Sequence, residues 1–363
     1  MSETTRLLLP ALALMVASVT APRVHAEPYL ALSMGLKCSA CHVNPTGGGM
    51  RNVFGSVWGQ NSLPARQVPS SDPWTGELNR HIAIGADLRG GATWLDQPAE
   101  KGRSSFDLTS LRAYLELRPL PDRLALYIDE RVAPGSATNA EAYLRAWTKG
   151  RRFYAKAGQM YLPYGIRLQD DGAFIREATS INFNTPDRGI ELGFDGSHWT
   201  GQLAITNGTA GAAEVDSGKQ WSLRGEYVGS SWRAGASFNI NDLPSGTRRM
   251  QNLFAGLKTG PVMWLTELDL IVDDSAGARR RQWIALAEAD WKLAAGQNLK
   301  ITAESFDPDR SAPDDRRTRL SLVWEYTPLP FLQVRAGIRN HDDVQEVPFY
   351  NQRVVFLQLH GFL

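Results

Sequence analysis

Two cysteines and a histidine near the amino terminus carry the most specific chemistry in this sequence. They form the pattern Cys38-Ser39-Ala40-Cys41-His42, and the 363-residue chain contains no other cysteine. Thiols at this spacing can each add to a vinyl group of haem, and the adjacent histidine then lies beneath the iron as its proximal ligand. The pattern therefore predicts one covalently bound haem c, attached through Cys38 and Cys41, with His42 as the metal ligand.

Three other interpretations of this motif are weaker. A thioredoxin-like redox pair is expected within a βαβ unit, and no such pattern surrounds the cysteines. A structural zinc site needs two further ligands, and the chain has no second cysteine pair. A disulfide between Cys38 and Cys41 is compatible with the spacing but gives His42 no role.

The sequence leaves the sixth ligand of the iron open. The candidates are two methionines and four histidines, namely Met34, Met50, His81, His198, His341 and His360, and a vacant sixth position is a further option. The run from Asn44 to Gly49 predicts a tight turn whose glycines let the backbone approach the porphyrin. Phe54 and Trp58 follow at helical spacing and could cover one face of the haem.

Two segments precede the main body of the chain. Residues 1–26 predict a secretory signal peptide, with a basic residue, an apolar stretch and a small-residue cleavage site. Residues 27–76 form the predicted haem-binding segment and a linker, in which Pro64, Pro69 and Pro73 interrupt regular structure. A segment of this size is near the lower limit for independent folding, so we expect other parts of the chain to cover the haem.

Charge and hydropathy exclude two classes of protein. The chain has 39 basic and 38 acidic residues, and removal of the predicted signal takes away Arg6, Arg23 and Glu3, which leaves 37 of each. A neutral chain offers no positive field to nucleic acid, so we expect no nucleic-acid partner. After the signal, no apolar run reaches the roughly 20 residues that a membrane-spanning helix needs.

Residues 77–363 alternate between apolar and polar side chains with a period of two. Leu115 and Leu117, for example, alternate with Glu116 and Arg118. Segments of about nine to fourteen residues with this pattern match tilted membrane strands that face lipid on one side and a polar lumen on the other. Sixteen strands are predicted, beginning near His81, Phe106, Leu124, Glu141, Phe153, Gly189, His198, Gln220, Trp232, Gln251, Pro261, Gln282, Asn298, Thr318, Phe331 and Gln352.

The connections between these strands indicate a closed barrel. Short turns alternate along the chain with longer polar loops, which are expected at 95–105, 132–140, 162–187, 207–219, 241–249, 273–281, 307–317 and 340–350. Short turns on one rim and long loops on the other are typical of outer-membrane barrels with an even number of strands. The predicted fold is all-β, a 16-stranded antiparallel transmembrane β-barrel with a small N-terminal monohaem cytochrome c segment.

Parts of the predicted barrel resemble known porins. The longest loop, at 162–187, is similar to the loop of trimeric porins that bends into the lumen and narrows it. The stretch Ala157–Gly165 before it resembles the strand-to-loop segment of phosphate-selective-type porins, a likeness that covers roughly residues 150–195. The chain ends in an alternating strand with Phe362 as the penultimate residue, whereas such barrels usually end on an aromatic residue. These likenesses imply a porin-type barrel and allow a homotrimer.

The order of the parts resembles the fused monohaem cytochrome–porin family of bacterial outer membranes. At residue level the likeness covers about residues 36–59, where the haem motif precedes Pro45, Phe54 and Gly55. Members implicated in iron oxidation pass electrons from extracellular Fe(II) to periplasmic carriers. The resemblance implies an outer-membrane protein in contact with lipid, whose partners are an extracellular electron donor or acceptor and a periplasmic cytochrome or other soluble carrier.

Electron transfer through the barrel by one haem is therefore the leading hypothesis, rather than a conventional enzyme activity. The undersized haem segment is expected on the periplasmic side or inside the lumen, whose walls would complete its pocket. The alternative is a small-solute diffusion porin in which the haem segment is a plug or sensor. A peroxidase-like enzyme is a third option, but no distal His/Arg pair is recognisable. Loop carboxylates could gather ferrous ions at the mouth, namely Asp307, Asp309, Asp314, Asp315, Asp342, Asp343 and Glu346.

Overall fold

The computed structural model describes residues 27–68, 72–98, 100–275, 277–342 and 351–363. The predicted signal peptide at residues 1–26 and the linker residue Pro69 therefore lie outside the described part of the chain. The helical elements of that part are α2 (Pro28–Met34), the 3₁₀ turn η1 (Cys38–Ala40), α3 (Val53–Asn61) and α4 (Phe174–Glu177). None of these described helices is long and apolar enough to span a membrane.

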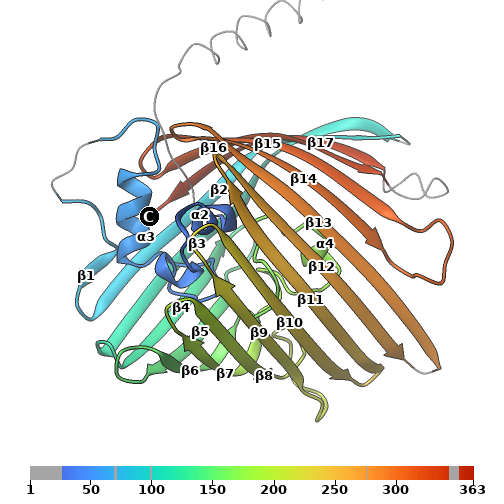
Figure 1. Ribbon diagram of the computed structural model, residues 1–363, viewed down its shortest axis with the longest axis horizontal. Coiled ribbons are helices and arrows are strands. Elements are labelled where there is room, and N and C mark those ends of the chain that lie inside the picture. The colour runs from blue at the N-terminus through green and yellow to red at the C-terminus, as the bar shows by residue number, and fades with distance from the viewer. Residues whose placement is uncertain (1–26, 69–71, 99, 276, 343–350) are drawn as a thin grey trace, which may run out of the picture.

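Sixteen antiparallel strands close into a barrel (Figure 1). In chain order they are β2 (Ile82–Gln97), β3 (Glu100–Leu120), β4 (Leu124–Ala133), β5 (Thr138–Trp147), β6 (Phe153–Met160), β7 (Asp187–Asp195), β8 (Trp199–Thr206), β9 (Gln220–Val228), β10 (Trp232–Leu243), β11 (Gly246–Thr259), β12 (Val262–Ser275), β13 (Ala278–Ala294), β14 (Gln297–Asp307), β15 (Arg317–Leu329), β16 (Leu332–Asp342) and β17 (Gln352–Phe362). Each strand pairs with the next, and β17 pairs back with β2 to close the ring. The short strand β1 (Glu77–Asn79) pairs with the start of β2. The predicted sixteen-stranded antiparallel barrel is confirmed.

The strands alternate between the lumen and the outer surface as their sequences predict. On β9, Ser222 and Arg224 are buried in the barrel, whereas Trp221 and Leu223 between them are exposed on the outside. The same alternation, with polar side chains inward and apolar side chains outward, continues around the barrel. The pattern suits a wall with lipid on one side and a polar interior on the other, and it is the reverse of a soluble sandwich.

Exposed aromatic side chains form two belts around the outer surface. One belt lies near the strand ends that meet in short turns and includes Phe153, Trp199, Trp232, Trp264 and Trp291. The other lies near the opposite strand ends and includes Trp94, Phe106, Trp221 and Trp283. Aromatic rings with a polar edge favour the headgroup level of a membrane, so paired belts are expected where a barrel crosses a bilayer.

Three of the predicted long loops are wrong, because the flanking strands continue to tight hairpins. The loops expected at 95–105, 241–249 and 273–281 are connections of two residues, at 98–99, 244–245 and 276–277. Cross-strand ion pairs hold these extensions, with Arg249 at 2.9 Å from Asp274 and Arg280 at 2.9 Å from Asp273. Since such extensions are polar on both faces, the alternation of apolar residues does not reveal them.

The longest loop, residues 161–186, crosses the lumen and contacts the opposite wall. The Tyr164 hydroxyl donates a hydrogen bond to Asp269 at 2.9 Å, and the backbone N–H of Ile166 donates to Glu267 at 2.6 Å. Both acceptors lie on β12, whereas the loop starts at β6 and returns to β7. The expectation that this loop narrows the lumen is confirmed.

Residues 27–66 contact lumen-facing side chains around the barrel. Hydrogen bonds join Glu27 to Lys300, Tyr29 to Glu325, Ser33 to Lys258, Lys37 to Asp195, Asn44 to Glu141 and Met50 to Tyr127. The backbone N–H of Ala65 donates to the carbonyl of Thr327 at 2.8 Å, at the short turn between β15 and β16. Most of these contacts lie in the half of the lumen that adjoins the short turns, and the contact of Asn44 with Glu141 extends beyond it.

Candidate functional site

The predicted haem motif folds as one compact turn. Its first residues form η1, and the backbone N–H groups of Cys41 and His42 both donate to the carbonyl of Cys38, at 3.1 and 3.0 Å. Side chains three and four positions apart in a helical turn project from the same side. The turn therefore presents both thiols and the imidazole together, which is the arrangement that covalent haem attachment requires.

Helix α3 begins directly against this turn. The Asn52 side chain caps the helix by accepting from the backbone N–H of Gly55 at 3.0 Å, and its amide donates to the carbonyls of Ser39 and Ala40 at 3.1 Å each. A Cβ atom at Gly55 would lie 2.1 Å from the carbonyl oxygen of Cys41. Only glycine permits this approach, so Gly55 fixes α3 on the motif.

The glycine-rich turn between the motif and α3 is also confirmed. The backbone N–H of Gly47 donates to the carbonyl of Asn44 at 3.0 Å, and Gly47, Gly48 and Gly49 have φ angles of 90°, 77° and 64°. A Cβ atom at Gly48 would lie 2.5 Å from the ring of Phe183 on the crossing loop. The turn therefore brings bare backbone close to the crossing loop and to Cys38, while the expected approach to a porphyrin stays a prediction.

An apolar cavity lies beside the motif, with about 820 Å³ of empty space that is partly open to solvent. Cys38, Cys41 and His42 all line it. Its apolar walls are formed by Leu30, Met34, Trp58, Leu63, Ile166 and Leu265, which come from the N-terminal segment, the crossing loop and β12. Its mainly apolar lining, with a few polar and charged groups, is typical of a cofactor site. We call it the motif cavity.

The motif cavity separates the candidates for the sixth iron ligand. Met34 lines it, whereas Met50 is 2% exposed and packs in a different cluster with Tyr127 and Tyr143. The four histidines are engaged elsewhere: His81 bonds to the carbonyl of Arg118, His198 to that of Val228, His360 to Asp87, and His341 packs on Phe174. Met34 is therefore the one predicted candidate whose side chain lines this cavity.

One of the two aromatic residues expected to cover the haem is placed for that role. Trp58 lines the motif cavity, as expected from its spacing after the motif. Phe54 is 48% exposed and is not among the residues that form the cavity wall, so that expectation is wrong.

Two buried arginines at the motif cavity have no carboxylate partner among the described residues. Arg51 and Arg167 are each 8% exposed and both line the cavity. Arg51 lies over the ring of Phe362 at 4.3 Å, and Arg167 donates to the carbonyl of Leu162 at 3.1 Å. Burial lowers the pKa of both guanidinium groups. Uncompensated buried cations are costly, so these two side chains favour the binding of an anion in the motif cavity.

These residues fit a haem c. The two thiols and the imidazole supply its attachment points and proximal ligand, and two unpaired arginines match its two propionate carboxylates. Burial lowers the pKa of His42 to about 4, with a further contribution from the charge of Arg51, so the imidazole is neutral at physiological pH. The neutral imidazole is the form that binds a metal. Burial raises the pKa of Cys41 to about 11, so this thiol is protonated and weakly nucleophilic at neutral pH.

The described residues of the acidic loops form no site for a metal ion. Among the described residues, no group of three or more His, Cys, Asp or Glu side chains is placed to hold a metal ion. Asp309 instead accepts hydrogen bonds from the backbone and hydroxyl of Ser311 at 3.0 and 2.6 Å, which closes a turn. Asp343 and Glu346 lie outside the described residues. The expected gathering of ferrous ions therefore has no structural support in the part of the loops that is described.

Comparisons with known proteins identify the barrel. No protein-family model matches the chain, and no curated protein sequence matches it. The anion-selective porin of Comamonas acidovorans is similar in structure, with a TM-score of 0.62 and 7% identity over 78% of this chain and 99% of that one. The outer-membrane expressed OmpT of Vibrio cholerae gives a TM-score of 0.61 and 11% identity over 79% and 99%. Pseudomonas putida OprB gives 0.60 and 8% over 79% and 95%.

At these identities the likeness shows the fold, which is that of a bacterial porin-type barrel. The covered share of this chain is close to the share made up by residues 77–363, the predicted barrel. The motif cavity draws most of its chemistry from residues 27–66, which precede the barrel.

Proposed function

We propose that this protein carries electrons across the bacterial outer membrane through one haem c held inside the barrel. The observation that carries the proposal is a single apolar cavity within the barrel that gathers both thiols, the histidine and two unpaired buried arginines. The apolar outer face and the two aromatic belts support a position in the outer membrane. An insulating layer about 30 Å thick is crossed by electrons only where a protein holds a redox centre within it.

Each residue of the motif cavity has a proposed task. Cys38 and Cys41 form the thioether attachments, His42 is the proximal ligand, and Met34 is the sixth ligand. Arg51 and Arg167 pair with the propionates, and Trp58 excludes water from one face. When bound, the haem supplies a reversible one-electron couple, Fe(II) to Fe(III). No acid–base or nucleophilic group is needed, because outer-sphere transfer requires only proximity and a matched potential.

The proposal includes the partners that such transfer requires. An electron donor or acceptor reaches the long-loop side, which we assign to the cell exterior, and a periplasmic cytochrome or other soluble carrier reaches the short-turn side. Vibrio cholerae OmpT is described in a trimer form, which supports a homotrimer of this chain as part of the proposal. The mass of the native protein in detergent tests that assembly directly.

A liposome experiment tests electron transfer. The full chain is produced in a host that assembles c-type cytochromes and is reconstituted in vesicles that enclose a soluble cytochrome c. An impermeant reductant is added outside, and the spectrum of the internal cytochrome is followed together with leakage of a small neutral sugar. We expect internal reduction with the wild type and none with the double variant Cys38→Ser and Cys41→Ser, which has the same barrel. A colourless mature protein, or equal reduction by both proteins, overturns the proposal.

The second candidate function is a small-solute diffusion porin in which residues 27–66 act as a plug. The structural likeness to porins, one of them described as anion-selective, favours it. The contacts of residues 27–66 and of the crossing loop oppose it, because both segments lie in the path of a solute. In the same vesicles, rapid leakage of the sugar without internal reduction identifies the pore.

A further inference from the structure

A second cavity adjoins the motif cavity and extends toward the long-loop rim. It contains about 1340 Å³ of empty space, part of it open to solvent, between β2, β3, β4, β16, β17 and the crossing loop. His42, Gly48 and Arg51 line both cavities. Arg131 and Arg339 line it near the strand ends that lead into outer connections. We call this cavity the basic vestibule, and whatever enters it arrives beside the haem motif.

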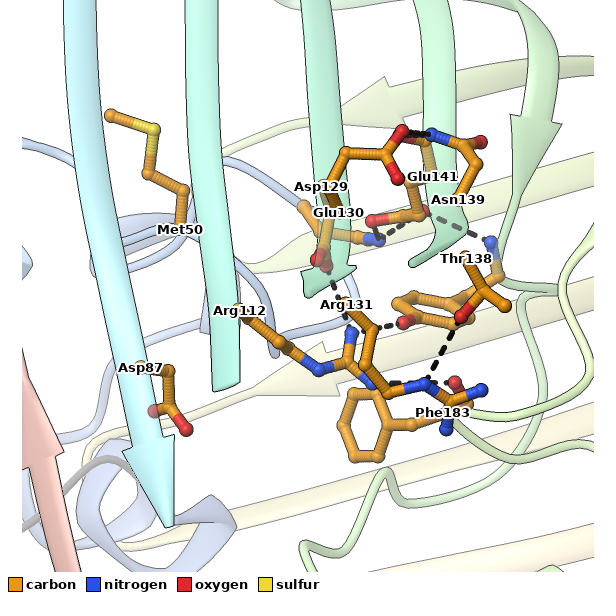
Figure 2. A network of polar contacts seen from close by, with 12 residues as sticks. Met50, Asp87, Arg112, Asp129, Glu130, Arg131, Thr138, Asn139, Glu141 and Phe183 are labelled. Carbon is orange, nitrogen blue, oxygen red and sulfur yellow. Dashed lines mark hydrogen bonds and ion pairs between the residues drawn. The ribbon is translucent and has the colours of Figure 1, made fainter. Parts of the chain in front are cut away.

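The side chains of the basic vestibule are mainly cationic. Six arginines line it, Arg51, Arg89, Arg112, Arg131, Arg335 and Arg339, against three aspartates, Asp87, Asp170 and Asp171. Figure 2 shows Arg112 and Arg131 reaching toward Phe183, with Asp87 on the neighbouring strand. Arg112 is paired with Asp129 at 3.1 Å and Arg335 with Glu325 at 3.0 Å, so the uncompensated charge is mainly that of Arg51 and Arg131. Within a partly enclosed cavity, this charge focuses a positive field on anything that enters.

The aspartates of the basic vestibule are already neutralised. Asp87 pairs with Arg89 at 2.8 Å, Asp170 with Arg339 at 2.9 Å and Arg319 at 3.1 Å, and Asp171 lies 4.0 Å from Arg176. Burial alone would raise the pKa of Asp170, but the guanidinium groups of Arg339 and Arg319 hold its pKa well below the usual range. Asp170 is therefore ionised, and each of these three carboxylates already has a guanidinium neighbour, so among the described lining residues no unpartnered carboxylate is offered to a free cation.

Two arginines of the basic vestibule have no carboxylate partner among the described residues. Arg131 donates only to neutral oxygens, those of Thr138 at 3.1 Å and Asn184 at 2.6 Å. Arg51 is the buried cation that the vestibule shares with the motif cavity. Arg131 thus lies near the outer end of the vestibule and Arg51 at its inner end, where its five N–H donors would be shared between a haem propionate and a bound anion. Guanidinium groups bind carboxylate and other oxyanions through two parallel hydrogen bonds.

We propose that the basic vestibule binds small polyanions that carry two or more carboxylate or other oxyanion groups, and that bound anions lie next to the proposed haem. This proposal deepens the proposed function. It rests on that function for one consequence, which is that redox-active anions, such as metal ions chelated by carboxylates, are the preferred electron partners. Free divalent cations are repelled by the same field, which replaces the expected role of the acidic loops.

Anion binding is tested first without reference to electron transfer. Citrate is titrated into the purified full chain in detergent by calorimetry, at low and at higher salt. We expect saturable binding that salt weakens, and a loss of about tenfold in affinity in the double variant Arg131→Gln and Arg339→Gln, because two cations of the field are removed. The control is Arg249→Gln with Arg280→Gln, which removes two outer-rim arginines that pair with aspartates away from the vestibule.

A second measurement compares redox probes of opposite charge on the haem-loaded protein. Stopped-flow oxidation of the reduced protein by hexacyanoferrate(III) and by hexaammineruthenium(III) transfers one electron to each probe. We expect the vestibule variant to slow the anionic probe about tenfold and to leave the cationic probe unchanged or faster.

Each of the two measurements can contradict its own part of the proposal independently of the other. Absence of citrate binding, or equal affinity in the vestibule variant, overturns the anion site whether or not haem is present. If the mature wild-type protein carries no haem but binds citrate, the proposed function is overturned and the anion site stands. Equal slowing of both probes by the vestibule variant overturns the preference for anionic partners.

Discussion

The motif cavity and the basic vestibule share a wall but are built in opposite ways. The motif cavity is lined mainly by one short stretch of chain, residues 27–66, together with side chains from the crossing loop and from β9, β10 and β12. The basic vestibule is polar, and its walls come from five strands and the crossing loop, which lie far apart in the sequence. Arg51, at the end of the haem turn, is common to both.

The difference separates two requirements of electron transfer. A bound redox centre needs a low-dielectric pocket that fixes its ligands, and a cluster of local residues can supply this. A site that selects a diffusing partner needs an open path and a field, which only the assembled barrel supplies. The two cavities should therefore respond differently to mutation, and the shared residue should affect both.

The largest expected effect is loss of the cofactor. The double variant Cys38→Ser and Cys41→Ser removes both attachment points, so we expect no covalent haem on a haem-stained denaturing gel. Citrate affinity should remain within about twofold of the wild type, since neither cysteine lines the basic vestibule. Ser39→Ala, within the same turn, is the control and should keep full haem content. Covalent haem in the double variant, or loss of citrate binding with it, contradicts the separation of the two cavities.

A change of axial ligand is the next largest effect. Met34→Ala should abolish the near-infrared charge-transfer band of methionine-ligated ferric haem and lower the midpoint potential by about 0.1 V or more, within the roughly 0.8 V that axial ligands span. The control is Met50→Leu, a volume-conserving change at a buried methionine outside the motif cavity. It should leave the spectrum intact. A band that survives in Met34→Ala but disappears in Met50→Leu assigns the ligand to Met50 instead.

The barrel could be predicted from the sequence because the alternation of apolar and polar residues lies within each strand and recurs in every strand. Each strand carries its own alternation, as in Trp221 to Arg224, and each short turn carries its own turn residues. Because the alternation recurs in sixteen strands, errors of a few residues at the predicted strand ends do not change the predicted number of strands. The hairpin extensions were missed because Arg249 and Asp274 are stabilised by each other across two strands, and neither follows an apolar pattern.

The motif cavity was partly predictable and the basic vestibule was not. The two thiols and His42 form a contiguous motif, and its turn is fixed by neighbouring residues. The choice of Met34 over Met50 depends on which wall each side chain faces, and single residues do not encode this. Arg131 and Arg339 are more than two hundred positions apart, and only the closure of β17 on β2 brings their strands into one cavity.

A smaller effect concerns the contact that fixes the haem turn on α3. Gly55→Ala places a methyl group 2.1 Å from the carbonyl oxygen of Cys41, so we expect a cost of about 1–3 kcal/mol in the stability of the N-terminal segment. Gly59→Ala is the matched control on the same helix, because its nearest neighbour would lie at 3.8 Å. Protease cleavage of residues 27–66 in the intact barrel measures the difference, and equal protection of both variants contradicts it.

The smallest effect tests the shared wall directly. Arg51→Gln removes a cation that favours the reduced, less positive haem, so we expect the midpoint potential to fall by about 50 mV, equivalent to roughly 1 kcal/mol at an effective dielectric constant of about 20. The same change should weaken citrate binding by a few fold, since the inner cation of the basic vestibule is lost. Arg131→Gln is the single-cavity control and should weaken citrate binding without moving the potential. If Arg51→Gln alters only one of the two properties, the two cavities are not coupled through this residue.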